Sequence, residues 1–526
     1  MRRSLILGTL LLLPPAGGLV AQGAVPAPPL TRAERTDYRE TSSYADVVGL
    51  LGVLDGAVSW LRVTSFGYSY EGRQLPLVVV GDVDAATPEA VRATGKTRVF
   101  VQANIHAGEV CGKEASLILL RELAQGAHPE WRDSLVLLIA PIYNADGNER
   151  VRLDNRPGQH GPVGGMGQRA NAQGLDLNRD HMKLDSPEAR SLAAFMTTWD
   201  PHVLLDLHTT NGTRRAYELL YAPPLHPETD PAIDRLLRSA WLPEVTERIA
   251  EADGWHFSYY GNLPYRRNVE RGWYTFDHRP RFNTNYIGLR NRFGILSEAY
   301  AYAPFELRVQ ATRRFVEEVV DYAYRNASTV RAVTEAADAT TFAGSTFAVR
   351  ATFARGDSVD ILLGEVAEER HPYTGQPMYR RLDVMHPERM PDFGSFAATE
   401  TVTVPETYVV PPELSAVLER LAAHGVVVER STSAQRRTLE RFRIDSTSVA
   451  EREYQGRRER ALFGRYELVE DTLPAGTVLV STAQPLGRLV VMLLEPRSDD
   501  GLAAWNVLDR ALDGVTYYPI QRVPTR

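Results

Sequence analysis

A histidine and a glutamate, His106 and Glu109, follow directly on the apolar run at residues 98–105. No other histidine in the sequence has an acidic residue three positions later. An imidazole nitrogen and a carboxylate oxygen are both zinc ligands, and a strand that ends in this pair can present them to one ion from a single turn. A surface histidine beside a helix-starting glutamate has the same pattern, so the pair needs a third ligand before it indicates a metal site.

His208 is the candidate for that third ligand, because it ends a second apolar run at residues 202–207 and is followed by the turn-like sequence TTNG. In an open α/β sheet, ligands gather at the carboxyl ends of the strands. We therefore predict that His106, Glu109 and His208 bind one Zn²⁺ per chain and leave a fourth position for water. His181 is a rival ligand, but it follows no strand end.

Between these ligands, residues 174–180 read GLDLNRD, and here the chain resembles the zinc metallocarboxypeptidases of the carboxypeptidase A/T type. The pattern of that family is His-x-x-Glu, then an arginine upstream of an Asp-x-Asn-Arg stretch, then a histidine at a strand end and a glutamate near the end of the domain. Every element occurs in this order within about residues 40–325. Five ordered motifs are far more specific than any one of them.

The resemblance implies two residues that act on the scissile bond. Glu298, in the apolar segment GILSEA, corresponds to the general base that takes a proton from the metal-activated water and passes it to the leaving amine. A carboxylate in a buried strand also needs a partner or a function. Arg169 corresponds to the residue that stabilises the developing oxyanion. Arg152 and Arg156 compete for that role, and the position of Arg169 relative to Asn178 favours Arg169.

The resemblance also implies how the substrate is held. Asn178 and Arg179 would bind the free C-terminal carboxylate, Arg179 through a bidentate ion pair. Asp176 would accept a hydrogen bond from the second ring nitrogen of His106. Asp180 is a departure from the family pattern, since an acid beside Arg179 could pair with it or discourage acidic C-termini.

The family further has a mobile tyrosine about two dozen residues before the general base. Tyr274 has about that spacing, but Tyr286 is nearby, and the sequence does not choose between them.

The N-terminus has the layout of a signal peptide, predicted at residues 1–23, which indicates a periplasmic or secreted protein. Removing its two arginines changes the formal net charge from −7 to −9. A mildly acidic chain without basic patches argues against nucleic acid as a partner, and no later apolar run is long enough for a membrane span. Cys111 is the only cysteine, so no intramolecular disulfide can form, and its position suggests inert packing near the site.

The chain is too long for one domain. We predict a catalytic α/β domain at residues 30–330, with a mixed central sheet flanked by helices, and an accessory β-rich or α+β domain at 340–526. The predicted elements are strands at 74–81, 98–105, 135–141, 203–208, 345–353, 358–364, 425–430 and 486–494, and helices at 112–125, 187–198 (with Ser186 as N-cap), 305–325 and 413–423.

The predicted function is zinc-dependent hydrolysis of peptide bonds at the C-terminus, with a peptide that has a free carboxylate as the substrate. Two alternatives stay open. A zinc amidohydrolase or deacylase on the same scaffold needs only the metal, Glu298 and an oxyanion donor. A catalytically inactive module that binds peptides or cell wall needs none of the chemistry, and Glu298 argues against it. The sequence does not indicate an oligomeric state.

Overall fold

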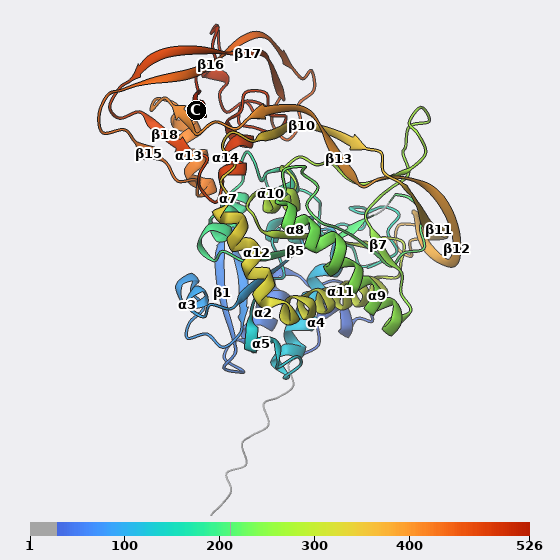
Figure 1. The fold of residues 1–526 in the computed structure, drawn as a ribbon. Coiled ribbons are helices and arrows are strands. Elements are labelled where there is room, and N and C mark those ends of the chain that lie inside the picture. The colour runs from blue at the N-terminus through green and yellow to red at the C-terminus, as the bar shows by residue number, and fades with distance from the viewer. Residues whose placement is uncertain (1–28, 211, 526) are drawn as a thin grey trace, which may run out of the picture.

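A mixed eight-stranded sheet forms the centre of the molecule in this computed structural model, which describes residues 29–210 and 212–525 (Figure 1). Its strand order is β1-β2-β4-β3-β5-β9-β6-β7. The four inner strands β4, β3, β5 and β9 are parallel, whereas β2 pairs with β1 and β4, and β6 with β9, in antiparallel fashion. The strands are β1 (Leu61–Tyr68), β2 (Gln74–Val80), β3 (Thr97–Ala103), β4 (Leu135–Ala140), β5 (Val203–Thr210), β6 (Leu219–Ala222), β7 (Phe257–Tyr259) and β9 (Phe293–Tyr300).

Helices cover both faces of this sheet. Successive side chains on a strand point to opposite faces, and strands β3, β4 and β5 are buried at every position, so both faces need a covering layer. Phe100 of β3 packs against Phe195 of α7, with ring centroids 4.4 Å apart. On the other face, Gly112 of α4 lies so close to Leu207 that a Cβ atom on the glycine would approach the leucine Cβ to 2.6 Å. The helices of this part are α1 (Arg32–Arg35), α2 (Tyr44–Leu54), α3 (Pro88–Ala93), α4 (Cys111–Ala124), α5 (Trp131–Ser134), α6 (Ala145–Glu149), α7 (Pro187–Thr198), α8 (Pro231–Leu236), α9 (Leu242–Asp253), α10 (Asn283–Leu289), α11 (Phe305–Arg325) and α12 (Ala327–Ala339).

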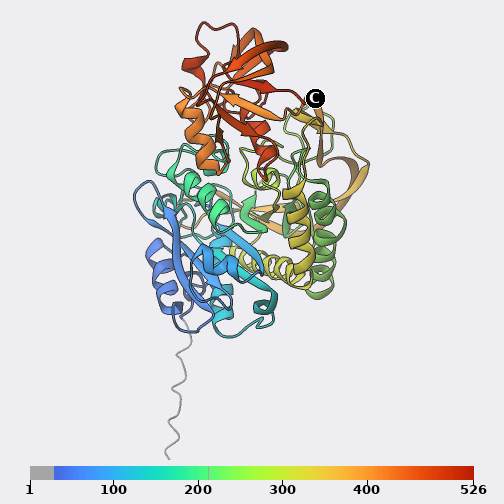
Figure 2. The same ribbon diagram turned by 60° about the vertical axis from the view of Figure 1, so that its left-hand side comes forward.

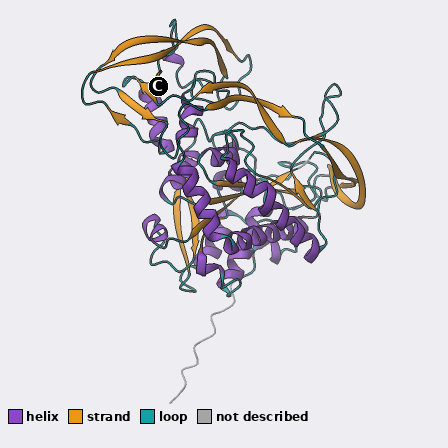
Figure 3. Ribbon diagram, in the orientation of Figure 1, coloured by secondary structure: helices purple, strands orange, loops and turns teal. Residues whose placement is uncertain are grey.

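The part after α12 consists mainly of antiparallel strands (Figure 3). A six-stranded sheet, β15-β18-β14-β19-β16-β17, lies above the α/β part at residues 29–339, which we call the catalytic unit because it contains the predicted site residues. The long β11–β12 hairpin extends along the side of this unit (Figures 1 and 2). β12 adds to the short strand β8 (Trp273–Tyr274) of the catalytic unit. The remaining elements are β10 (Thr346–Ala354), β11 (Ser358–Arg370), β12 (Pro377–Phe393), β13 (Ser395–Thr403), β14 (Thr407–Val410), α13 (Ser415–His424), β15 (Glu429–Arg430), β16 (Gln435–Val449), β17 (Arg460–Leu473), β18 (Val478–Ser481), α14 (Gly487–Leu494) and β19 (Gln521–Val523).

The predicted fold class is confirmed, with a central mixed sheet flanked by helices and additional β-rich sheets in the C-terminal part. Helices α7 and α11 have the predicted bounds, and the Ser186 side chain caps α7 by accepting from Ala189 N. The predicted strand at 486–494 is wrong, because this segment is helix α14 and all eight of its residues are buried. Most of the segment is the unbroken apolar run at residues 489–494, and a short apolar run of this length fits a buried strand as well as a buried helix.

The two parts share one apolar core, which includes β-strand residues of the central sheet, all of the apolar residues of α14 and the fully buried Trp505. The C-terminal part therefore packs firmly on the catalytic unit. Within the described residues, no helix combines the length and the apolar character that crossing a bilayer requires. The predicted signal peptide lies outside the described residues.

Candidate zinc centre and active site

His106, Glu109 and His208 come together at the carboxyl edge of the central sheet. Their ligand atoms all lie within 4.8 Å of one another, and all three side chains are buried. The Nδ1 atoms of His106 and His208 lie 3.1 and 2.9 Å from the two carboxylate oxygens of Glu109. Thr209 N donates to Glu109 Oε2 and helps to fix that carboxylate. Two nitrogens and one carboxylate that face a common point are a donor set suited to zinc.

Each histidine has a carboxylate behind its second ring nitrogen. His106 Nε2 lies 2.9 Å from Asp176 Oδ1, and His208 Nε2 lies 2.9 Å from Asp206 Oδ2. Such carboxylates hold Nε2 protonated, so that Nδ1 presents its lone pair to a metal. The sequence pattern indicated Asp176 but not Asp206. The available signal was the spacing: residues two apart on a strand share a face, so Asp206 and His208 of β5 point to the same side.

Glu298 is next to the zinc ligands because β9 pairs with β5. His208 and Glu298 are directly opposite in the parallel register of these strands. Burial raises the pKa of Glu298 to about 7, and among the described residues its Oε2 atom has no hydrogen-bond partner. The side chain also lines the cavity in front of the triad. A carboxyl group with this pKa can exchange a proton near neutral pH.

Arginines surround the same cavity. Arg169 binds Asp176 Oδ2 through Nε and Nη2 at 2.9 and 2.8 Å, and its Nη1 lies 3.6 Å from Glu109 Oε1. Arg156 lies closer to the ligands, with Nη2 2.9 Å from Glu109 Oε1, and both arginines line the cavity. Arg152 instead pairs with Asp154, and its side chain is 69% exposed. Arg169 and Arg156 are therefore the two candidates for the residue that stabilises the oxyanion, and Arg152 is not.

Neighbouring positive charges lower the pKa values of two carboxyl groups at this site, Glu109 and Asp176. Burial alone would raise the pKa of Glu109, but His106 and Arg156 hold it well below the usual range. In the same way, His106 and Arg169 oppose the burial of Asp176 and lower its pKa. Both carboxylates are therefore ionised at neutral pH, as a metal ligand and the hydrogen-bond acceptor behind it should be.

Asn178 and Arg179 belong to a short 3₁₀ turn, Leu177–Arg179, that follows Asp176. Asn283 N donates to Asn178 Oδ1, and this bond orients the side-chain amide. The guanidinium of Arg179 stacks on Phe282, with Cζ 3.8 Å from the ring centroid. Both residues line the cavity.

Asp180 does not pair with Arg179. It is completely buried, binds Lys183 and accepts hydrogen bonds from Asp185 N and Ser186 N. The suggestion that this acid opposes acidic C-termini at Arg179 therefore has no structural support.

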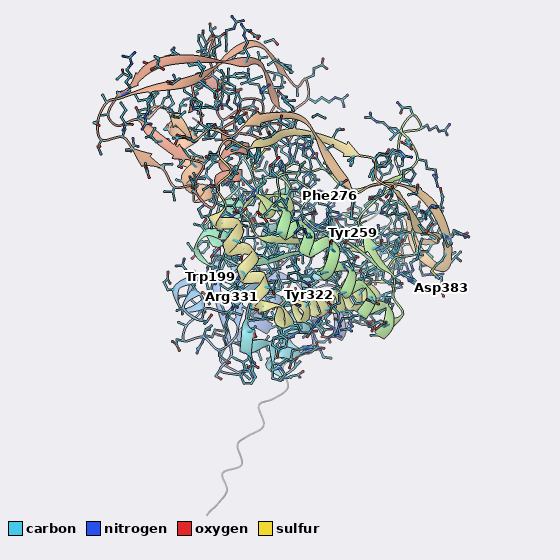
Figure 4. All side chains as sticks on the ribbon, in the orientation of Figure 1. Trp199, Tyr259, Phe276, Tyr322, Arg331 and Asp383 are labelled. Atoms are coloured by element: carbon cyan, nitrogen blue, oxygen red, sulfur yellow. The ribbon has the colours of Figure 1, made fainter. Side chains whose placement is uncertain are left out.

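The cavity in front of the triad has a volume of about 180 Å³. Neither Tyr274 nor Tyr286 is among its lining residues: Tyr274 stacks on Phe393, and Tyr286 is buried against His181. At the family spacing of about two dozen residues before Glu298, the cavity is lined by Phe276, which has no hydroxyl group (labelled in Figure 4). A larger cavity of about 340 Å³ lies beyond Tyr260 and contains none of the predicted site residues.

The remaining candidates do not contribute a ligand. His181 is buried outside the triad, and burial lowers its pKa to about 4. Cys111 is buried at the start of α4, with Sγ 3.0 Å from Thr209 Oγ1, and burial raises its pKa. This environment agrees with a packing role for the thiol.

The chain is similar to several known carboxypeptidases. Residues 57–217 match the family model described as zinc carboxypeptidase. The chain is 23% identical to Carboxypeptidase 2 of Trichophyton rubrum over 498 residues, which is 90% of this chain and 85% of that protein. It is 34% identical to Carboxypeptidase D of Mus musculus over 137 residues, 22% of this chain and 10% of that protein. The solved structure of carboxypeptidase A from Helicoverpa armigera aligns with a TM-score of 0.41 at 16% identity, covering 55% of this chain and 75% of that one.

Residues 57–217 thus match the zinc carboxypeptidase family, and this match together with the carboxypeptidase relatives indicates a zinc metallocarboxypeptidase, a hydrolase. Zinc is the metal of this family, and the buried triad has the donor set for it. The matched range contains all three triad residues but ends before Glu298.

Proposed function

We propose that this chain removes residues from the C-terminus of peptides by zinc-dependent hydrolysis, with Glu298 as the general base and Asn178 and Arg179 as the binding site for the terminal carboxylate. The observation that supports it most is that one cavity is lined by the triad, by the half-buried Glu298 and by the cationic Arg179. A peptide whose carboxylate contacts Arg179 has its last peptide bond inside the same small space.

In this proposal the zinc ion is held by His106, Glu109 and His208. A bound zinc ion would lower the pKa of a coordinated water and polarise the scissile carbonyl. Glu298 accepts the water's proton at its free carboxylate oxygen and then donates it to the leaving amine. Its Oε2 atom has no hydrogen-bond partner among the described residues, so this oxygen is available for both halves of the transfer.

Arg169 stabilises the negative charge that develops on the carbonyl oxygen. Its two bonds to Asp176 fix the guanidinium before the reaction begins, and a group that needs no reorientation stabilises a transition state most effectively. Asn178 contributes a side-chain amide oriented by Asn283, and Arg179 contributes a cation whose plane is fixed on Phe282. A carboxylate is bound by both a charge and directed N–H groups.

We keep the prediction that the protein is exported, periplasmic or secreted, on the basis of the signal-peptide layout of residues 1–23. The substrate is then a peptide outside the cytoplasm.

Two peptides that differ only in C-terminal amidation test the proposal. The free acid should be cleaved with a kcat/KM about 100-fold or more above that of the amide, since a lost charge-assisted contact in a buried site costs several kcal/mol. Arg179→Ala should remove most of this preference. Arg190→Ala, which removes a partly exposed arginine that bonds to Glu419 and Leu184 O, is the matched control and should keep it.

The alternatives give different results in this experiment. Equal cleavage of both peptides by the unaltered enzyme would contradict the exopeptidase proposal and favour the amidohydrolase or deacylase. No cleavage of either peptide by zinc-loaded protein would favour the inactive binding module.

A further inference from the structure

We propose that the turn at residues 454–457, which belongs to the C-terminal β-rich part, completes the substrate-carboxylate site, and that Tyr454 is a positioning residue for Arg179. This inference rests on the proposed function of Arg179 and deepens it. It also gives the C-terminal part a role in substrate selection.

The contact that carries the inference joins two residues 275 positions apart: Arg179 Nε donates to Tyr454 OH at 3.0 Å. Arg179 Nη1 donates to its neighbour's carbonyl, Asn178 O, at 2.6 Å. Together with the stacking on Phe282, these bonds fix the guanidinium in both its plane and its rotation. They use Nε and one hydrogen of Nη1, so the edge formed by Nη1 and Nη2 is the one that a substrate carboxylate would contact.

A second contact from the same turn reaches the loop behind the zinc ligands. Asp176 N donates to Gln455 Oε1 at 2.8 Å, and Asp176 in turn binds His106 Nε2. Gln455 has a backbone φ of 52°, which lies in the left-handed region that residues other than glycine rarely adopt. A residue held there indicates that the surrounding contacts fix the turn.

The turn is anchored on both sides. Arg457 forms a 2.6 Å ion pair with Asp185, and Tyr454 stacks on Trp505, with ring centroids 6.3 Å apart. Glu459, just beyond the turn, forms an ion pair with the buried Arg281. All of these partners except Trp505 belong to the catalytic unit, so the turn is fixed relative to the cavity.

Fixing Arg179 matters because a flexible arginine would lose rotational freedom when substrate binds. An arginine that is already oriented loses less, so more of the ion-pair energy appears as affinity. Tyr454 therefore acts on binding of the free carboxylate, and substrates that lack this carboxylate gain nothing from it.

Tyr454→Phe removes only the hydroxyl group and keeps the ring that stacks on Trp505. In this variant we expect the ratio of kcat/KM for the free-acid peptide to kcat/KM for the amidated peptide to fall about tenfold. The fall should come mainly from a higher KM for the free acid, while kcat/KM for the amidated peptide stays the same. Tyr517→Phe is the matched control, because Tyr517 is exposed to the same degree (40%, against 39% for Tyr454) and its hydroxyl also bonds to a side chain, Glu467. It should keep the preference.

Arg179→Ala combined with Tyr454→Phe gives a double-mutant cycle. If Tyr454 acts through Arg179, the tyrosine change should have no further effect in the Arg179→Ala background. Zinc content and melting temperature of each variant show that the fold is intact.

Three results would overturn the inference. A normal preference in Tyr454→Phe would remove the positioning role and leave the proposed function intact. An equal loss on both peptides would indicate a structural role only. If the unaltered enzyme did not prefer the free acid, the proposed function would fail, and the inference with it.

Discussion

Two edges of one cavity differ in how the chain builds them. The zinc edge uses the carboxyl ends of adjacent parallel strands, where His106 follows β3, and His208 and Glu298 lie opposite each other on β5 and β9. The edge proposed to bind the substrate carboxylate, which we call the carboxylate edge, is a short turn, Leu177–Arg179, held by side chains that come from distant segments. Strand pairing brings His208 and Glu298 together at the first edge, and hydrogen bonds such as Thr209 N to Glu109 complete it, whereas Arg179 of the second edge is held by a residue of the C-terminal part.

The difference suggests a division of labour. A metal site and its general base require fixed geometry, which a buried parallel sheet supplies. Substrate selection can vary without disturbing that geometry if it resides in a turn and in the part that packs on it. The stacking of Arg179 on Phe282 and its hydrogen bond to Tyr454 are contacts of this kind, made by the turn with other segments.

The largest effect should come from the zinc edge. Replacing His106, Glu109 or His208 by alanine should reduce bound zinc from about one ion per chain to a small fraction and abolish peptide cleavage, since two ligands make an incomplete set. Metal analysis of the purified variants measures this. His386→Ala, which removes an exposed histidine paired with Glu365, should retain zinc. Unchanged zinc in all three ligand variants would refute the site.

A smaller effect concerns the attachment of the C-terminal part. His424 of α13 is buried, accepts a hydrogen bond from Tyr286 OH at Nδ1 and donates from Nε2 to Met182 O. Burial lowers its pKa to about 3, so the folded state holds it neutral. An unfolded histidine takes up a proton below its ordinary pKa of 6.5, so this group's contribution to stability is complete above pH 6.5 and is lost as the pH falls toward 3.

At pH 4.5 that loss amounts to about 2–3 kcal/mol. The free energy of unfolding in urea at pH 7.5 and 4.5 measures it, with His424→Asn as the comparison. The variant should lose less stability between the two pH values than the unaltered protein. Equal losses would show that His424 does not link the two parts in its neutral form.

The smallest effect should come from the carboxylate behind His208. Asp206→Asn should weaken zinc binding about 10- to 100-fold without removing a ligand, because the amide no longer holds Nε2 protonated with a full charge. Competition with a chelator measures the affinity. Asp176→Asn, which alters the equivalent partner of His106, should have an effect of the same size. Wild-type affinity in Asp206→Asn would show that His208 needs no such partner.

The zinc edge was largely predictable from the sequence. Apolar runs that end in His106 and His208 indicate strands, and parallel strands bring their carboxyl ends to one side of a sheet. The period of two along β5 could also have identified Asp206. The helices α7 and α11 were predictable because polar and apolar residues alternate with helical spacing and α7 begins with a serine cap.

The carboxylate edge was not predictable to the same extent. Nothing local in the sequence connects Arg179 with Tyr454, because only tertiary packing brings a turn 275 residues away to the cavity. Likewise, Asp180 looks available for Arg179 in the sequence, but the fold buries it against Lys183. Segment 486–494 was predicted as a strand because its unbroken apolar run at residues 489–494 is as short as a buried strand.

The central claim is that the zinc edge combines a metal site with a separate general base, and Glu298→Gln tests it most directly. Zinc content and kcat/KM are measured on the same preparation. Because Glu298 is not among the three ligands, the variant should keep about one zinc per chain while kcat falls about 100- to 10,000-fold, as an amide cannot accept the proton of water. A zinc-loaded Glu298→Gln enzyme that cleaved peptides near the normal rate would contradict the account.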